Sequence, residues 1–222
     1  MIKILCLHGI GTNSEIFEIQ TAKLRRVLGD GYQFDFVEGN HPWPAAPGIR
    51  EVFGNNQICF SYSDGSAEST REAVSDLADY IIANGPFPCV LGFSMGASLL
   101  ATLLLSADAR SAANQIKSAI FLSGTAPCDW DELQKGRIRF LNGKDVPRQD
   151  AIRTPTLHAW SAFDLDYPGQ SCQLVQACKE DNRKEIMHSA GHAIPIADHE
   201  ITNIAAAIRE LIIGTLGAAN VG

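Results

Sequence analysis

The residue best suited to chemistry is the serine of Gly92-Phe93-Ser94-Met95-Gly96, which is flanked by two glycines. This pentapeptide lies between two apolar runs, 88–91 and 97–105. A Gly-x-Ser-x-Gly sequence between a buried strand and a helix is typical of a tight turn that exposes the serine hydroxyl at the edge of a sheet. Glycines suit the turn because side chains there would collide with neighbouring backbone. The pattern predicts that Ser94 is a nucleophile for acyl transfer, the alternative being a strand-to-helix turn with an incidental serine.

A serine nucleophile needs a base, and an imidazole is the side chain that can take and return its proton near neutral pH. Three histidines lie earlier in the chain or within a strand pattern: His8, His41 and His158. We expect His192 to be the base, because it follows Gly191 in a loop between a strand and the last helix. His188, at a strand end, is expected to pack. Together with Asp198 and His199 these residues resemble a metal cluster, but no helix sets their spacing, so we expect no metal.

The acid that orients the histidine is expected in the loop after the strand 155–160. That loop contains two aspartates, Asp164 and Asp166. We expect Asp164, because it lies closer to the carboxyl end of the strand. Without the serine and the histidine, either aspartate would be read as a solvated loop carboxylate.

The oxyanion of acyl transfer needs preorganised N–H donors. One is expected from the backbone of Met95, at the start of the helix that follows the serine. The second is expected from Ile10, in the glycine-containing loop 8–13 after the first strand. A nucleotide-binding loop is the alternative reading of 8–13, but the third glycine of that fingerprint is missing and no P-loop lysine follows.

Strand and helix patterns alternate along the chain, which predicts a mostly parallel sheet flanked by helices, in the α/β class. We expect one domain, 1–222, with no large lid and a frayed tail from Gly214. The predicted strands are 2–7, 32–37, 88–91, 117–123, 155–160 and 184–188, with a short extended piece at 57–62. The predicted helices are 14–28, a helix from Ser69 or Thr70 to 84, 97–105, 170–179 and one around 201–212. Three prolines predict a loop at 41–48.

Composition excludes several classes of protein. The 222 residues are 45% hydrophobic and 19% charged, as in an ordinary globular domain. The net charge of −7 comes without a basic cluster, so nucleic acid is not an expected partner. The six cysteines are scattered, without a Cys-x-x-Cys pair, which favours free thiols in a reducing compartment. No signal peptide or apolar run of membrane-spanning length is recognisable, so we expect a cytoplasmic protein and no membrane partner.

Five segments together resemble the FSH family of small serine hydrolases, within the α/β-hydrolase superfamily, over nearly the whole chain. They are Leu5-Cys6-Leu7-His8-Gly9-Ile10-Gly11-Thr12-Asn13, Phe36-Val37-Glu38-Gly39, Ser61-Tyr62, Gly92-Phe93-Ser94-Met95-Gly96 and Gly191-His192-Ala193-Ile194-Pro195. The resemblance implies a compact α/β-hydrolase fold and a triad of Ser94, Asp164 and His192. Two positions depart from the common pattern: Ser161 stands where glycine is frequent, and Met95 where many relatives have glutamine.

The family includes the human ovarian-cancer-associated hydrolase and fungal thioesterases and carboxylesterases, some of which release acyl chains from polyketide synthases. The resemblance therefore implies hydrolysis of an acyl ester or thioester without a cofactor, with an acyl carrier domain as a possible partner. Trp43, with Phe53 and Phe163, is a candidate apolar rim for the acyl chain, and ordinary packing of these aromatic residues is an equal alternative. A lyase or an acyltransferase on the same triad, and a non-catalytic binding module, remain alternatives.

Overall fold

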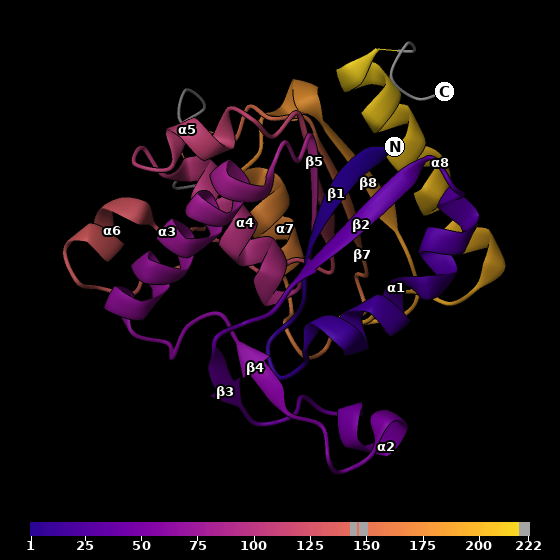
Figure 1. The fold of residues 1–222 in the computed structure, drawn as a ribbon, viewed down its shortest axis with the longest axis horizontal. Coiled ribbons are helices and arrows are strands. Elements are labelled where there is room, and N and C mark those ends of the chain that lie inside the picture. Colours follow the sequence, from indigo (N-terminus) through magenta and orange to yellow (C-terminus); the bar gives the residue numbers. More distant parts are fainter. Residues whose placement is uncertain (143–145, 147–150, 218–222) are drawn as a thin grey trace.

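The computed structural model describes residues 1–142, 146 and 151–217. Its centre is a six-stranded parallel sheet in the order β2-β1-β5-β6-β7-β8 (Figure 1). These strands are β1 Ile2–Leu7, β2 Tyr32–Val37, β5 Cys89–Phe93, β6 Ser118–Leu122, β7 Thr156–Trp160 and β8 Arg183–Met187. The predicted mostly parallel α/β architecture is confirmed.

The central strands are buried on both faces, which explains their continuous apolar sequences. Every residue of β5 and β6 is buried. One face packs against α1 and α8 through a cluster that includes Phe17 and Ile208. The other face packs against α3 and α4, with Ile81 and Leu100 in the core. The principal helices are α1 Ser14–Leu28, α3 Ala67–Asn84, α4 Met95–Leu105, α7 Gln170–Gln176 and α8 Asp198–Leu216.

Some element boundaries differ from the prediction. The segment 41–48 is not entirely loop, because β3 His41–Trp43 pairs antiparallel with β4 Cys59–Ser61. Helix α3 starts at Ala67 because the Ser66 side chain accepts the Ser69 N–H and caps it there. Short helices that no periodicity indicated are α2 Ile49–Phe53, α5 Arg110–Ala113, α6 Trp130–Gln134 and the 3₁₀ turn Glu180–Asn182.

The C-terminal helix is longer than predicted. Helix α8 continues past Gly214 to Leu216, because Ile204, Ile208 and Ile212 anchor its apolar face in the core. The expected frayed tail therefore does not begin at Gly214, and the remainder of that tail, 218–222, lies outside the described residues. Over the described part of the chain, no helix has the length and apolar character to cross a membrane.

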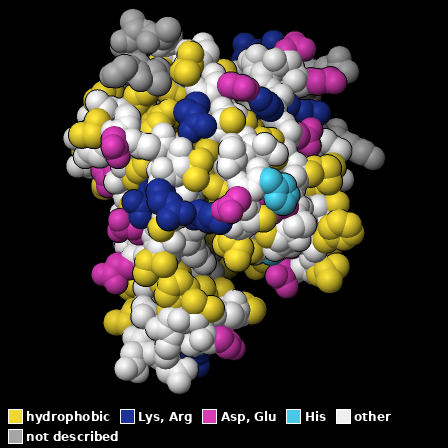
Figure 2. All heavy atoms as spheres, turned by 90° about the vertical axis from the view of Figure 1, so that its right-hand side faces the viewer, with side chains coloured by type: hydrophobic (Ala, Val, Ile, Leu, Met, Phe, Trp, Pro, Cys, Tyr) yellow, Lys and Arg dark blue, Asp and Glu magenta, His cyan; other side chains and the backbone are white. Residues whose placement is uncertain are grey.

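The surface over α1 and α8 carries charges of both signs, and Figure 2 shows blue and magenta side chains intermingled there. Lys23 pairs with Asp198 at 2.7 Å, and Lys184 on β8 pairs with Glu210 at 2.5 Å. The cations on this face are thus partly neutralised by carboxylates within salt-bridge distance.

All six cysteines are free, as expected, and all but Cys172 are buried. Burial raises the pKa of the Cys89 and Cys178 thiols to about 12. Thiols in such surroundings are not reactive nucleophiles. Neither of these two cysteines is therefore an alternative to Ser94 as a candidate nucleophile.

His158 on β7 should make the protein acid-labile. Burial, followed by the nearby Arg183, lowers the pKa of His158 to about 3, whereas an unfolded histidine titrates near about 6.5. The contribution of neutral His158 to the free energy of unfolding is thus complete above the pKa of the unfolded state. It is lost as the pH falls toward the pKa of the folded state. Between pH 7 and pH 5 the loss should be about 2 kcal/mol. Urea unfolding at both pH values measures this loss. Between them, the free energy of unfolding of His158→Gln should fall by about 2 kcal/mol less than that of the wild type. Equal losses in the two proteins would refute this role.

Candidate active site

Ser94 occupies a strained turn between β5 and α4. Its φ of 53° and ψ of −117° lie in a region that residues other than glycine rarely adopt. A Cβ at Gly92 would lie 2.6 Å from the Ala97 nitrogen, and one at Gly96 would overlap the carbonyl oxygens of Leu7 and His8. The two glycines thus allow the turn to pack closely, and the turn holds the serine at the carboxyl edge of the sheet.

The structure brings Ser94, His192 and Asp164 together, as expected from their sequence positions. The Nε2 atom of His192 lies 2.8 Å from the Ser94 hydroxyl, and its Nδ1 atom lies 2.7 Å from Asp164 Oδ2. The side chains of His192 and Asp164 are 9% and 5% exposed, so water competes little for these contacts. Three side chains from distant parts of the chain form one hydrogen-bonded series.

Asp164 is fixed by its own loop. Its Oδ1 atom accepts the backbone N–H groups of Asp166 at 3.1 Å and Tyr167 at 2.9 Å, which leaves Oδ2 for His192. Asp166, the alternative acid, contributes to this arrangement through its backbone. The departure at Ser161 also shapes the loop, because its hydroxyl accepts the Phe163 N–H at 3.1 Å.

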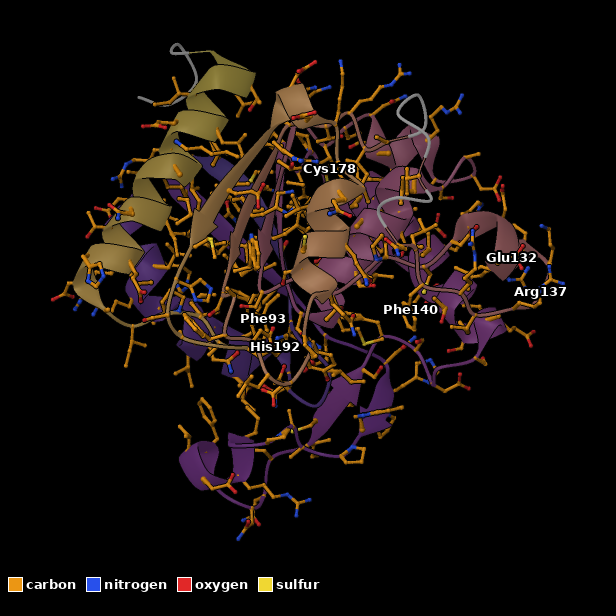
Figure 3. All side chains as sticks on the ribbon, turned by 180° about the vertical axis from the view of Figure 1, so that it is seen from behind. Phe93, Glu132, Arg137, Phe140, Cys178 and His192 are labelled. Carbon is orange, nitrogen blue, oxygen red and sulfur yellow. The ribbon has the colours of Figure 1, made fainter. Side chains whose placement is uncertain are left out.

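Two aromatic rings pack against the imidazole of His192. The Tyr167 ring centroid lies 4.5 Å from that of His192, and the Phe93 ring lies 5.5 Å away. Figure 3 shows Phe93 and His192 beside each other at the edge of the sheet. Tyr167 therefore contacts both Asp164 and His192, since its N–H binds the Asp164 carboxylate and its ring packs on the imidazole. The sequence does not indicate Tyr167 as a site residue, because only the loop conformation brings it to the imidazole.

The other histidines have different surroundings. His188 is buried and accepts the Ala190 N–H, and burial lowers its pKa. His158 contacts the Thr156 hydroxyl at 3.0 Å. His8 belongs to the turn after β1, where its Nδ1 atom lies 2.7 Å from the Gly9 carbonyl and its Nε2 atom accepts the Gly39 N–H. In the described part of the chain, no three His, Cys, Asp or Glu side chains are grouped to hold a metal ion.

Two backbone N–H groups are available beside Ser94. Ile10 and Met95 both line the same cavity as the serine, and neither N–H donates to a group of the described residues. The Met95 N–H is also the first of α4, where the helix dipole favours negative charge. The loop that carries Ile10 is held by Tyr62, whose hydroxyl accepts the His8 N–H at 2.8 Å. Met95, the second departure from the family pattern, places its sulfur 3.3 Å from the Ser61 hydroxyl.

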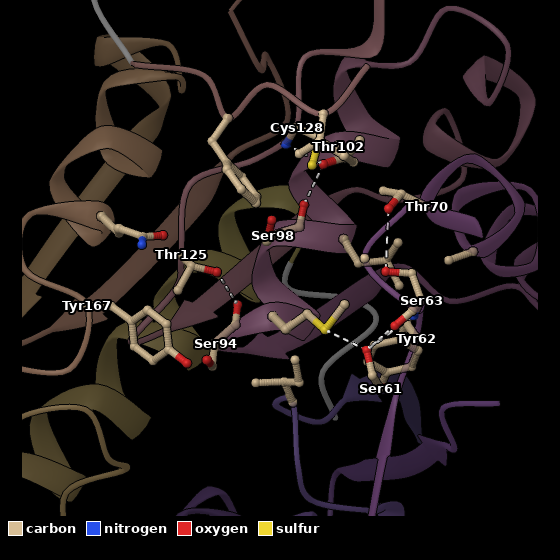
Figure 4. Close-up of a pocket in the computed structure, with 18 of the residues that line it drawn as sticks. Ser61, Tyr62, Ser63, Thr70, Ser94, Ser98, Thr102, Thr125, Cys128 and Tyr167 are labelled. Atoms are coloured by element: carbon tan, nitrogen blue, oxygen red, sulfur yellow. Dashed lines mark hydrogen bonds between the residues drawn. The ribbon is translucent and has the colours of Figure 1, made fainter. Parts of the chain in front are cut away.

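A cavity of about 360 Å³ adjoins Ser94 and is lined mainly by apolar atoms (Figure 4). Of the three aromatic residues predicted at its rim, only Trp43 lines it. Phe53 instead packs with Ile49 in a separate apolar cluster beneath α2. Phe163 is 73% exposed, because the turn that directs Asp164 inward leaves its neighbour outside. The rim prediction is therefore wrong for these two residues.

Ser123, after β6, supports the loop that carries His192. Its φ of 41° is unusual for a serine, and its hydroxyl donates to the Ala193 carbonyl at 3.2 Å. We expect Ser123→Ala to lower kcat by about tenfold, the equivalent of one lost hydrogen bond, while KM changes little. Steady-state kinetics on a p-nitrophenyl ester measure this effect. An unchanged kcat in a stably folded variant would show that the hydroxyl does not position the histidine.

Comparison with known proteins agrees with this arrangement. The model of the family described as serine hydrolase (FSH1) matches residues 1–204. The chain is 35% identical to "Esterase FPY3" of Fusarium mangiferae over 214 residues, covering 95% of this chain and 97% of that one. It is 31% identical to "Hydrolase phiM" of Fungal sp. (strain ATCC 74256), covering 96% of each.

Solved structures support the fold. A Bacillus cereus carboxylesterase matches with a TM-score of 0.63 at 15% identity, covering 95% of this chain and 88% of that chain. Arabidopsis thaliana SOBER1 matches with a TM-score of 0.56 at 19% identity, covering 95% and 99%. The chain belongs to the serine hydrolase (FSH1) family and is a serine hydrolase of the esterase type.

Proposed function

We propose that Ser94, His192 and Asp164 are the catalytic triad of this esterase and that it acts through an acyl-Ser94 intermediate. The observation that carries the proposal is the continuous series of short contacts from the Asp164 carboxylate through His192 to the Ser94 hydroxyl. In this series the carboxylate holds the imidazole in the tautomer whose Nε2 atom can accept the serine proton.

The reaction begins when Ser94 Oγ attacks the acyl carbonyl and its proton passes to His192 Nε2. The N–H groups of Ile10 and Met95 stabilise the tetrahedral oxyanion, each contributing roughly 3 kcal/mol. The imidazolium then protonates the leaving group. Water, deprotonated by the same imidazole, attacks the acyl-serine, and the free acid leaves.

The proposed substrate is an ester or thioester of an apolar acyl group, including a fatty or polyketide chain held on an acyl carrier domain. The size and apolar lining of the cavity support an acyl chain there, since pockets of this size bind small apolar ligands. The same intermediate forms whether an oxygen or a sulfur atom leaves, so the chemistry extends to thioesters.

A substrate panel tests this proposal. One acyl group is offered as a p-nitrophenyl ester, a coenzyme A thioester and a thioester on an acyl carrier domain, and the products are identified by mass spectrometry. We expect the free acid from each, and the highest kcat/KM from the carrier-bound form. Preference for the free ester would contradict the carrier as substrate, and transfer of the acyl group to an added alcohol or amine in place of water would contradict hydrolysis.

A further inference from the structure

The cavity has a direction, which is set by helix α4. Ser94, Ser98 and Thr102 all line it and succeed one another every four residues, so they lie along one face of the helix. Eight residues of helix correspond to about 12 Å. Figure 4 shows Ser94, Ser98 and Thr102 in that order, with Cys128 beside Thr102. An acyl chain attached to Ser94 would thus follow α4 away from the reacting carbonyl.

The distal end of the cavity is lined by residues that precede β7. The Cys128 N–H donates to the Thr102 hydroxyl at 3.0 Å, which places Cys128 two helical turns from Ser94. Cys128 in turn forms an antiparallel bridge with Phe140. Phe140 and Ile138 both line the cavity, and the bridge places Phe140 at the end remote from the nucleophile.

These two apolar residues belong to a short segment, 137–141, that we call the strap. Its side chains alternate, so that Ile138 and Phe140 face the cavity while Arg137 and Arg139 point away from it. Arg137 binds Glu132 of α6 at 2.7 Å, and Figure 3 shows this pair at the outer edge of the molecule, beyond Phe140. The contacts of Arg137 and Lys135 lower the pKa of Glu132 to about 2.

A second set of contacts ties the strap to the segment before α6. The Asp129 carboxylate accepts Arg139 Nε at 3.0 Å. Backbone bonds of 2.8 Å run from Asp129 N–H to the Arg139 carbonyl and from Leu141 N–H to the Pro127 carbonyl. The strap is therefore a fixed wall, and its apolar side chains are held at the cavity by bonds on either side of them.

We propose that the strap is the subsite for the distal part of the acyl group and that Ile138 and Phe140 select medium-length aliphatic chains. Ile138 is 39% exposed and Phe140 is 59% exposed, so a chain laid against them removes apolar surface from water on both partners. A short acyl group bound at Ser94 would not reach them. This inference rests on the proposed acyl-Ser94 mechanism.

The test is a series of p-nitrophenyl esters from acetate through butyrate, hexanoate and octanoate to decanoate. In the wild type, kcat/KM should rise by about fourfold for each methylene that reaches the strap. Phe140→Ala should lower kcat/KM for octanoate and decanoate by about tenfold and leave acetate within about twofold. Ile138→Ala should show a smaller loss in the same direction. Ile213→Ala is the matched control, because Ile213 is 41% exposed on α8 and does not line the cavity.

The outcomes separate this inference from the proposed mechanism. If Phe140→Ala and Ile138→Ala change all esters by the same factor, or do not lower the activity on the long ones, the strap is not the acyl subsite. That result leaves the mechanism intact as long as Ser94→Ala abolishes turnover of acetate. The result we expect is that both strap variants lose the preference for octanoate and decanoate while Ile213→Ala keeps it.

Discussion

Replacing Ser94 by alanine should lower kcat for a p-nitrophenyl ester by about 10⁴-fold or more, with the residual rate due to the N–H donors and substrate binding. In the proposed mechanism the Ser94 hydroxyl oxygen bonds to the substrate, and it lies 2.8 Å from His192 Nε2, the atom proposed to take its proton. Steady-state kinetics measure the loss, and a fluorophosphonate probe should label the wild type and not the variant.

The matched control for this substitution is Ser75→Ala. Ser75 is exposed on α3 and does not line the cavity beside Ser94, so its removal should leave kcat within about twofold, as surface changes usually do. Retention of near-full activity by Ser94→Ala, with unchanged unfolding by urea, would exclude the serine as nucleophile.

Replacing Asp164 by asparagine should lower kcat by about 10⁴-fold. The amide retains the shape of the carboxylate, but it can present an N–H to His192 Nδ1 and so favour the tautomer whose Nε2 atom carries the proton. That imidazole cannot accept the proton of Ser94. The expected signature is a fall in kcat with little change in KM, measured on the same ester.

Asp166→Asn provides the paired comparison. Asp166 donates its backbone N–H to Asp164, and this bond survives a change of side chain. Its kcat should therefore stay within about threefold of the wild type, as expected for a side chain that does not touch the imidazole. A large loss in Asp166→Asn, with a small one in Asp164→Asn, would reverse the assignment of the acid.

Much of the site could be predicted from the sequence because its chemistry is carried by local patterns. The turn around Ser94 needs glycine on both sides for steric reasons, and these are visible as residue types. The serine, the aspartate and the histidine lie in the loops after β5, β7 and β8, and the carboxyl ends of these parallel strands meet at one edge of the sheet. The nearly continuous apolar runs of β1, β5 and β6 are typical of strands buried on both faces, so they indicate a parallel sheet by residue type alone.

The lining of the cavity could not be predicted in the same way. Ile138 and Phe140 alternate with two arginines, but this short pattern does not show which side faces a cavity, and their position depends on ion pairs with Asp129 and Glu132. Tyr167 reaches the imidazole only because its backbone caps the Asp164 carboxylate. Contacts of this kind are tertiary, so residue type and spacing do not specify them.

Phe53 and Phe163 were predicted at the rim of the cavity but do not line it. Both are large apolar residues in segments outside the central sheet, which made them candidates for the rim. The direction of a side chain is set by the local backbone that carries it. Here Phe53 points into a local apolar cluster and Phe163 points toward solvent. Size and hydrophobicity alone did not distinguish them from Trp43.

The most direct measurement is the identification of the covalent intermediate. The enzyme is mixed with a p-nitrophenyl ester, quenched in acid during the first turnover, digested and analysed by mass spectrometry. We predict a burst of about one p-nitrophenolate per enzyme and an acyl mass on the peptide that contains Ser94. An acyl group found on another side chain, such as the Cys128 thiol in the same cavity, with Ser94 unmodified, would contradict the account.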